Sequence, residues 1–159
     1  MLVPIEFPPH FDTLKIPQDV SDKLALVRTR VERFQDCWAE HHAAQFVAAD
    51  YELVYQSLAW IDSTQFLEGR RFLEWGAGFS TVACLADQLG WNSYAIEAHP
   101  DLIPQARTTI QDWSARVTLY EGNFLPPDAS DLATDPTLPS LGHGGRPAYR
   151  EWDLDLDDF

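Results

Sequence analysis

The sequence has few cysteines, few basic residues and no long apolar run. Only two of its 159 residues are cysteines, and 11 lysines and arginines stand against 25 aspartates and glutamates. Cys37 and Cys84 lie far apart in predicted helices, which favours buried thiols in a reducing cytoplasm over a disulfide or a metal pair. No apolar segment approaches the roughly 20 residues that span a bilayer. The first ten residues hold three prolines and no basic stretch, unlike a signal peptide, so we expect no membrane partner.

The acidic excess argues against nucleic acid as a partner. A net charge of −14 repels a phosphate backbone, so any acceptor or ligand is more plausibly a small molecule or a protein. Half of this excess lies in residues 121–159, which contain nine acidic and two basic residues. We interpret this region as a solvated acidic tail; the alternative is attraction to the five basic residues before position 34. With 45% hydrophobic residues and six tryptophans, the chain can form one domain.

The stretch from Arg71 to Asn123 alternates between strand and helix patterns. Apolar runs at 71–75, 93–96 and 116–120 predict strands. Between them, apolar residues recur at helical spacing: Val82, Leu85, Ala86 and Leu89 before Gly90, then Leu102, Ala106, Ile110 and Trp113 after Pro100. Strands that alternate with helices of this length predict an α/β fold with right-handed crossovers and a parallel sheet.

The ends of these strands carry the residues of a nucleotide site. Gly76 and Gly78 follow the first strand, where glycines allow close backbone approach and a helix N-terminus offers free N–H groups. Glu97 ends the second strand, 19 residues after Gly78, close to the roughly 20-residue offset of a ribose-binding acid. This geometry predicts an adenosine-containing cofactor.

The glycine loop distinguishes between two cofactor classes. A dinucleotide fingerprint has Gly or Ala three residues beyond its second glycine, where this chain has Thr81. The pattern Glu74-x-Gly76-x-Gly78-x-Ser80-Thr81, followed by Glu97 and Asn123, resembles the class I S-adenosylmethionine-dependent methyltransferases. Segments 46–55 and 154–159 are also similar to one bacterial branch of that family. A nicotinamide-dependent oxidoreductase is the disfavoured alternative, because of Thr81 and Glu74.

The resemblance implies a Rossmann-like fold: a partial parallel sheet of order 3-2-1 flanked by helices, with an N-terminal helical extension. It implies that S-adenosylmethionine is bound by Glu74, Gly76, Gly78, Ser80, Glu97 and Asn123. Glu74 would orient the loop and meet the amino group of the cofactor, Glu97 would bind the ribose, and Asn123 would lie near the adenine amino group. Trp75 and Phe124 either flank the adenine or fill the core. No catalytic base is predicted.

We expect three regions along the chain. Residues 1–68 form an extended segment, through about residue 17, and helices; 69–125 form the cofactor-binding core; 126–159 form an acidic Pro/Gly-rich loop or disordered tail. A helix from about Asp19 carries an apolar seam: Val20, Leu24, Val27, Val31, Phe34 and Trp38. This seam favours packing on the core of the chain itself; the alternative is a homodimer. A second helix begins after its N-cap, Asp50, and Tyr51 and Tyr55 on it either fill the core or line the pocket.

Methyltransferases of this class have seven strands, and this chain ends where the fourth is expected. The resemblance therefore implies truncation and raises a second hypothesis, a non-catalytic remnant domain that acts in protein interaction. An uncovered edge on the first strand would be a pairing liability, so we expect the acidic tail or a second copy to cover it. No metal is expected, because adjacent His41 and His42 point in different directions.

Overall fold

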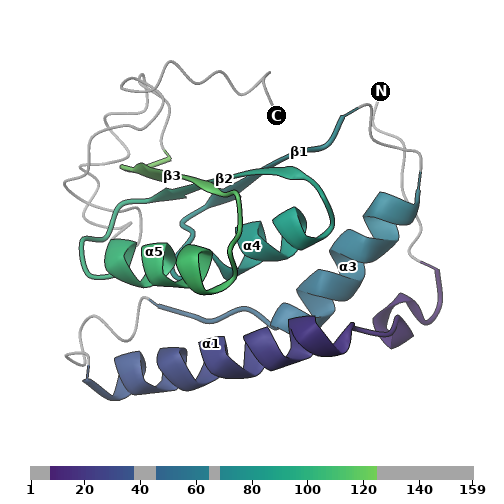
Figure 1. Ribbon diagram of the computed structural model, residues 1–159, viewed down its shortest axis with the longest axis horizontal. Coiled ribbons are helices and arrows are strands. Elements are labelled where there is room, and N and C mark those ends of the chain that lie inside the picture. The colour runs from purple at the N-terminus through teal and green to yellow at the C-terminus, as the bar shows by residue number, and fades with distance from the viewer. Residues whose placement is uncertain (1–7, 38–45, 65–68, 125–159) are drawn as a thin grey trace, which may run out of the picture.

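The computed structural model describes residues 8–37, 46–64 and 69–124 (Figure 1). The elements in chain order are a 3₁₀ turn η1 (Phe11–Thr13), α1 (Gln18–Cys37), α3 (Tyr51–Ser63), β1 (Arg71–Trp75), α4 (Thr81–Gln88), β2 (Asn92–Glu97), α5 (Ile103–Asp112) and β3 (Thr118–Glu121). The predictions made for Trp38, the histidine pair 41–42 and the tail 126–159 lie outside these residues.

The three strands form one parallel sheet in the order β1-β2-β3. Leu73 pairs with Tyr94 and Ala95 pairs with Leu119, so the carboxyl ends of all three strands lie at one edge of the sheet. This confirms the α/β fold and the predicted strand order 3-2-1. The bounds of β1 are those predicted, whereas β2 begins one residue earlier and β3 two residues later than expected.

The molecule is layered, with its described helices on one side of the sheet. Figure 1 shows α4 and α5 directly beneath the strands, α1 below those helices, and α3 beside α4, rising from the level of α1. Small side chains of Ala83 and Ala95 let α4 approach the sheet closely. On the opposite face of the sheet, Ile96 is fully buried among Leu73, Tyr120 and Phe124. The described helices therefore cover one face of the sheet.

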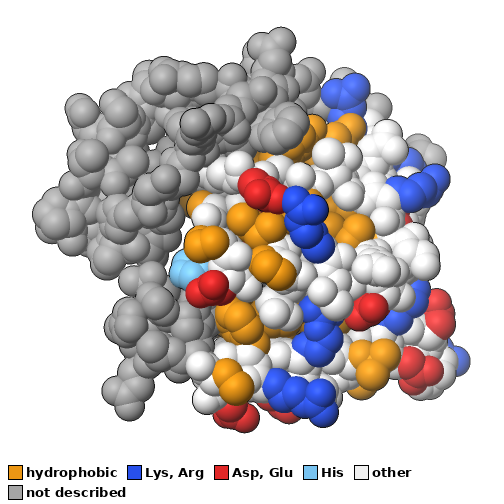
Figure 2. Space-filling model, turned by 60° about the vertical axis from the view of Figure 1, so that its left-hand side comes forward, with side chains coloured by type: hydrophobic (Ala, Val, Ile, Leu, Met, Phe, Trp, Pro, Cys, Tyr) orange, Lys and Arg blue, Asp and Glu red, His pale blue; other side chains and the backbone are white. Residues whose placement is uncertain are grey.

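The charged side chains of the surface are mixed in sign. On the face drawn in Figure 2, basic and acidic side chains lie interspersed with isolated apolar ones. No described helix is long and apolar enough to cross a membrane. Within the same residues, no group of three or more His, Cys, Asp or Glu side chains could hold a metal ion.

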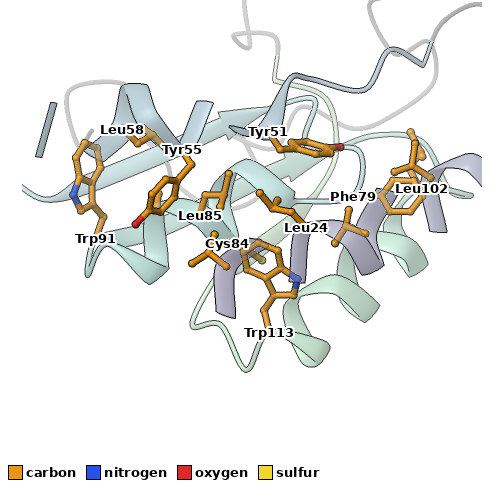
Figure 3. Close-up of a cluster of buried hydrophobic side chains, with 14 residues drawn as sticks. Leu24, Tyr51, Tyr55, Leu58, Phe79, Cys84, Leu85, Trp91, Leu102 and Trp113 are labelled. Carbon is orange, nitrogen blue, oxygen red and sulfur yellow. The ribbon is translucent and has the colours of Figure 1, made fainter. Parts of the chain in front are cut away.

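The main core lies between the two helix layers. Its largest buried side chains come from α1, α3, α4 and the loops around them, as Figure 3 shows: Leu24, Tyr51, Tyr55, Leu58, Phe79, Cys84, Leu85, Trp91, Leu102 and Trp113. The apolar seam of α1 points into this core, since Leu24 is 1% exposed whereas Leu26 is 68% exposed. The seam of α1 thus packs on its own chain, as predicted.

Asp50 begins α3 as expected, because its Oδ1 accepts a hydrogen bond from the Leu53 N–H at 3.1 Å. Tyr51 and Tyr55 are buried on the inner face of this helix, 6% and 7% exposed. The interpretation of both tyrosines as core residues is confirmed.

Three local expectations were wrong. Residues 11–13 form a helical turn rather than extended chain, because the backbone N–H and the hydroxyl of Thr13 both donate to the His10 carbonyl. Pro100 lies in a turn before α5 instead of opening it, and Pro104 occupies the first turn. Cys37 is exposed at the end of α1, whereas Cys84 is buried.

Candidate cofactor-binding site

The candidate site lies at the carboxyl ends of the parallel strands, where β1 leads into α4. Parallel α/β sheets bind ligands at this edge because the loops there diverge over the strand ends. The register places the end of β1 next to the end of β2, and Glu97 next to Glu121 of β3. The Gly122 N–H also donates to the Glu97 carbonyl at 2.9 Å, which joins the tips of β2 and β3. The predicted site residues of the three strands therefore converge.

The loop between β1 and α4 depends on its glycines. Gly76 has φ +63° and Gly78 has φ +55°, a left-handed conformation that side chains strain, and Ser80 has φ +54° immediately before α4. The Ala77 N–H between the glycines donates to the Ile96 carbonyl at 2.9 Å. The loop is thus fixed to the second strand, and the role of its glycines in binding a cofactor stays a prediction.

Glu97 is the centre of the polar contacts in the site. Its side chain is 5% exposed, and its Oε2 accepts the Gly78 N–H at 2.6 Å while Oε1 accepts the His99 N–H at 2.7 Å. An ionised carboxylate offers about four acceptor positions, so two remain for hydroxyl donors such as those of a ribose. The carboxylate therefore holds the glycine loop and keeps acceptor capacity toward a ligand.

Glu74 lies under the loop rather than at its surface. Its Oε2 accepts the Ala83 N–H of the first turn of α4 at 2.9 Å. Burial raises the pKa of Glu74 to about 8, and the nearby Glu97 charge adds to this rise, while the N–H groups of Ala83 and Val82 oppose it. Glu74 thus ties the end of β1 to the start of the helix that follows.

One hydroxyl at the start of α4 lacks a hydrogen-bond partner in the described part of the chain. Ser80 is 0% exposed and its side-chain oxygen has no partner there, whereas the side chain of Thr81, 1% exposed, lies beside Tyr51. Buried polar groups are nearly always satisfied, and a helix N-terminus also presents free N–H groups. Asn123, only 3% exposed, adds a buried amide just beyond β3. These groups together could bind a polar ligand.

The two aromatic residues at the rim are stacked on each other. The rings of Trp75 and Phe124 lie 5.8 Å apart between centroids and at 7° between planes, and Trp75 is 53% exposed. Phe124 also lies over Gly76, where an added Cβ would meet its ring at 3.8 Å. The sequence left open whether this pair flanks the adenine or fills the core. The structure shows a mutual stack at the edge of the site, with Trp75 more than half exposed.

Two further aromatic residues lie near the loop, and only one of them was considered for the site from the sequence. Phe46 was not predicted as a site residue, yet it lies so close to Gly78 that an added Cβ would be 2.9 Å from its Cε2 atom. Tyr51, expected either in the core or in the pocket, borders the site as well as the core: burial raises its pKa, the Glu74 charge adds to the rise, and the Thr81 side chain opposes it. The Asp50 capping signal places the start of α3 and hence Tyr51.

A cavity of about 350 Å³ lies at the other end of β1. It is lined by Ile61, Asp62, Ser63, Thr64, Gly69, Arg70 and Trp91. The carboxylate of Asp62 accepts the Trp91 indole N–H at 2.7 Å and pairs with Arg70 at 2.9 Å. The carboxylate of Asp62 thus joins α3 to the start of the sheet, and we assign the cavity no chemistry.

No family model matches the chain, and no curated protein matches it. Among solved structures, it is similar to a precorrin-6Y C5,15-methyltransferase from Geobacter metallireducens, with a TM-score of 0.40 and 24% identity over 55% of this chain and 49% of that one. It is also similar to the methyltransferase PaMTH1 of Podospora anserina, solved with S-adenosylhomocysteine bound, with a TM-score of 0.49 and 16% identity over 85% and 57%. The chain spans about half the length of these two proteins.

Proposed function

We propose that this chain carries the cofactor-binding half of an S-adenosylmethionine-dependent methyltransferase. The observation that supports this most strongly is the position of Glu97, whose carboxylate holds the Gly78 N–H at 2.6 Å and lies next to the β3 tip that leads to buried Asn123. A ribose at Glu97 would direct the adenine toward Asn123 and the rest of the ligand toward the glycine loop. The composition of the loop agrees, since residues 74–81 contain no lysine or arginine for phosphates.

The described residues would bind and orient the cofactor. Glu97 would accept the ribose hydroxyls, Asn123 would accept the adenine amino group through its carbonyl oxygen, and the Ser80 hydroxyl would meet the polar end of the ligand. When bound, the cofactor supplies an electrophilic methyl group on a sulfonium. Glu74 would hold the start of α4 in register beneath the ligand.

The methyl acceptor would be a small molecule or a protein. Methyl transfer breaks the carbon–sulfur bond, forms a bond to the acceptor nucleophile and leaves S-adenosylhomocysteine. It requires an acceptor aligned behind the methyl carbon. Residues that could align it were not identified in the described chain, so the acceptor half of the site is a separate question.

A second candidate function is protein interaction by a domain that binds cofactor poorly. The observation that favours it is the position of β1 at the edge of the described sheet, with Trp75 53% exposed beside it. Exposed strand edges and large aromatic side chains are features of pairing surfaces. The two functions differ in whether the intact glycine loop binds an adenosine ligand.

Calorimetric titration with S-adenosylhomocysteine tests the proposal. We expect a Kd in the micromolar range for the wild type, and Glu97→Ala should weaken binding about 10–100-fold, since it removes charge-assisted hydrogen bonds. Glu121→Ala is the matched control, because Glu121 pairs with Glu97 in the sheet but is 45% exposed and bound to Arg107. If the folded wild-type protein does not bind S-adenosylhomocysteine, the second candidate function, protein interaction, is favoured. Binding of NADH alone would indicate an oxidoreductase.

A further inference from the structure

The ring of Phe46 fills the space that the second glycine leaves open. A Cβ added to Gly78 would lie 2.9 Å from the Phe46 Cε2 atom, closer than real contacts allow. In dinucleotide-binding loops the second glycine serves to let the backbone approach the ligand pyrophosphate. Here the close approach at that position is made by a hydrocarbon ring of the same chain.

Phe46 is held in this position by two other rings. Its centroid lies 6.2 Å from that of Phe34, at 80° between planes, and 5.6 Å from that of Phe79, at 35°. Phe34 and Phe79 themselves meet edge to face at 5.5 Å. Edge-to-face and tilted pairs at these distances are favourable. Since Phe79 follows Gly78 directly, the cluster is built around the glycine loop.

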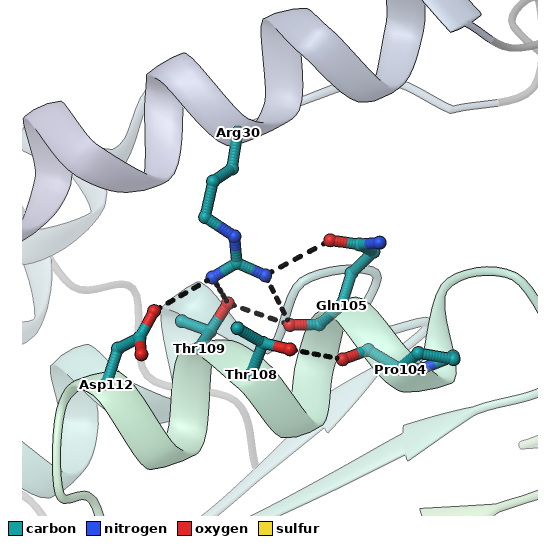
Figure 4. A network of polar contacts seen from close by, with 6 residues as sticks. All are labelled: Arg30, Pro104, Gln105, Thr108, Thr109 and Asp112. Atoms are coloured by element: carbon teal, nitrogen blue, oxygen red, sulfur yellow. Dashed lines mark hydrogen bonds and ion pairs between the residues drawn. The ribbon is translucent and has the colours of Figure 1, made fainter.

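The cluster is anchored on two helices through Arg30. The guanidinium of Arg30 on α1 lies 5.4 Å from the centroid of the fully buried Phe79 ring. Figure 4 shows how α5 fixes it: Nη2 donates to the carbonyl and side-chain oxygens of Gln105 at 2.9 and 3.1 Å, and Nη1 donates to Thr109. Because Phe46 packs on this anchored Phe79 ring, Phe46 cannot move aside for a ligand without loss of its contact with Phe79.

The surroundings of Phe46 are unfavourable for phosphate groups. A pyrophosphate at Gly78 would give up its hydration against an apolar ring, which is costly without compensating donors. The Glu97 carboxylate already takes the Gly78 N–H, so this donor is not available to a phosphate oxygen. An uncharged thioether or ribose, by contrast, gains from apolar contact with the ring.

We propose that Phe46 is a specificity-determining residue, which lets the site take an adenosine ligand without phosphates and excludes pyrophosphate-bearing dinucleotides. The proposal rests on the proposed function, because it concerns the same glycine loop. It assigns to the segment before α3 the role of selecting the cofactor class.

The test compares two ligands that share an adenosine, S-adenosylhomocysteine and ADP-ribose, by calorimetric titration. The measured quantity is the ratio of the ADP-ribose Kd to the S-adenosylhomocysteine Kd. In Phe46→Ala this ratio should fall at least about tenfold. The reason is that S-adenosylhomocysteine loses apolar contact with the ring, whereas the pyrophosphate of ADP-ribose gains room. Phe46→Leu should act in the same direction, because it removes the ring atoms next to Gly78 while it keeps apolar volume in the cluster.

Leu58→Ala is the matched control. Leu58 on α3 is buried in the main core, 7% exposed, whereas the ring contacts of Phe46 are with Phe34 and Phe79. A purely structural change would weaken both ligands alike, so this variant should leave the ratio unchanged. An unchanged ratio in the folded Phe46 variants overturns the inference while the proposed function stands. Wild-type preference for ADP-ribose would instead overturn the proposed function.

Discussion

At the scale of single residues, the two acids of the site, buried Glu97 and half-buried Glu74, have different tasks. Glu97 satisfies two backbone N–H groups, one of them in the glycine loop, and keeps acceptor positions for a ligand. Glu74 satisfies one N–H at the start of α4, and burial raises its pKa to about 8. Acids with a strongly raised pKa are common in functional sites. The rise for Glu74 follows from burial first, and the nearby Glu97 charge adds to it.

The raised pKa of Glu74 predicts a pH dependence of stability. Between its ordinary value of 4.5 and about 8, the folded chain holds a proton that the unfolded chain has released. The free energy of unfolding should therefore fall as the pH rises through this window. Glu74→Gln keeps an oxygen for the Ala83 N–H and cannot ionise, so it should lose this dependence.

Urea unfolding at several pH values measures the effect. The stability of Glu74→Gln relative to the wild type should rise by about 1–2 kcal/mol between pH 5 and pH 8, less than a fully buried acid would give. Parallel stability curves for the two proteins across this range would contradict the assignment of a protonated Glu74.

At the scale of elements, α1 is attached to the rest of the chain by one face. The apolar seam of α1, which includes Leu24, is buried in the core. Arg30, on the same helix, reaches α5. The Arg30 guanidinium makes three hydrogen bonds, to Gln105 twice and to Thr109, an ion pair with Asp112 at 3.5 Å and a stack on Phe79. The N-terminal helix is therefore bound to α5 and to the glycine loop by the same side chain.

We expect Arg30→Ala to lower the free energy of unfolding by about 2–3 kcal/mol, because it removes hydrogen bonds from a charged donor and leaves Thr109 and Gln105 without them. Arg28→Ala on the same helix is the control. Arg28 pairs with Glu52 at 2.7 Å, but both side chains are nearly half exposed, so its loss should cost about 0.5 kcal/mol or less. Denaturant unfolding of both variants provides the comparison, and equal losses would contradict the anchoring role of Arg30.

The elements that could be predicted from the sequence are those fixed by local patterns. The apolar run 71–75 ends at a glycine, and β1 has those bounds; the apolar spacing of α1 and the Asp50 cap of α3 also decided their structure. The acid Glu97 could be placed beside the loop because parallel strands end at one edge. In each case the information lies within one element or follows from the sheet topology.

The contacts that could not be predicted join segments far apart in the chain. Phe46 packs on Gly78, and Arg30 stacks on Phe79, through side-chain packing that no periodic pattern encodes. The exposure of Cys37 was missed because a helix pattern does not show where its last turn leaves the core. The proposed specificity of the candidate site thus depends on the contact between Phe46 and Gly78, which is of the kind that sequence patterns reveal least.

At the scale of the whole molecule, the described sheet has two edges, and β1 forms one of them. No described strand other than β2 pairs with β1. The expectation that the acidic tail or a second copy covers this edge involves residues outside the described ranges and stays a prediction. It matters because β1 carries Glu74 and leads directly into the glycine loop.

The net charge of −14 acts on the molecule as a whole. On the face drawn in Figure 2 acidic and basic side chains are interspersed. The excess negative charges of the chain repel one another more strongly in the compact state than in the unfolded chain. Salt should relieve this repulsion, because the Debye length shrinks from about 30 Å at 0.01 M to about 8 Å at 0.15 M.

We therefore expect the Tm at pH 7.5 to rise by about 3–5 °C between 10 mM and 200 mM sodium chloride, measured by differential scanning fluorimetry. At pH 4.5, which is the sequence pI, the same salt change should leave the Tm nearly constant, because the net charge vanishes there. A Tm that falls with salt at pH 7.5 would mean that local pairs such as Arg28–Glu52 outweigh the global repulsion. The comparison between the two pH values separates the net charge from effects of the salt on apolar surface, which would act at both.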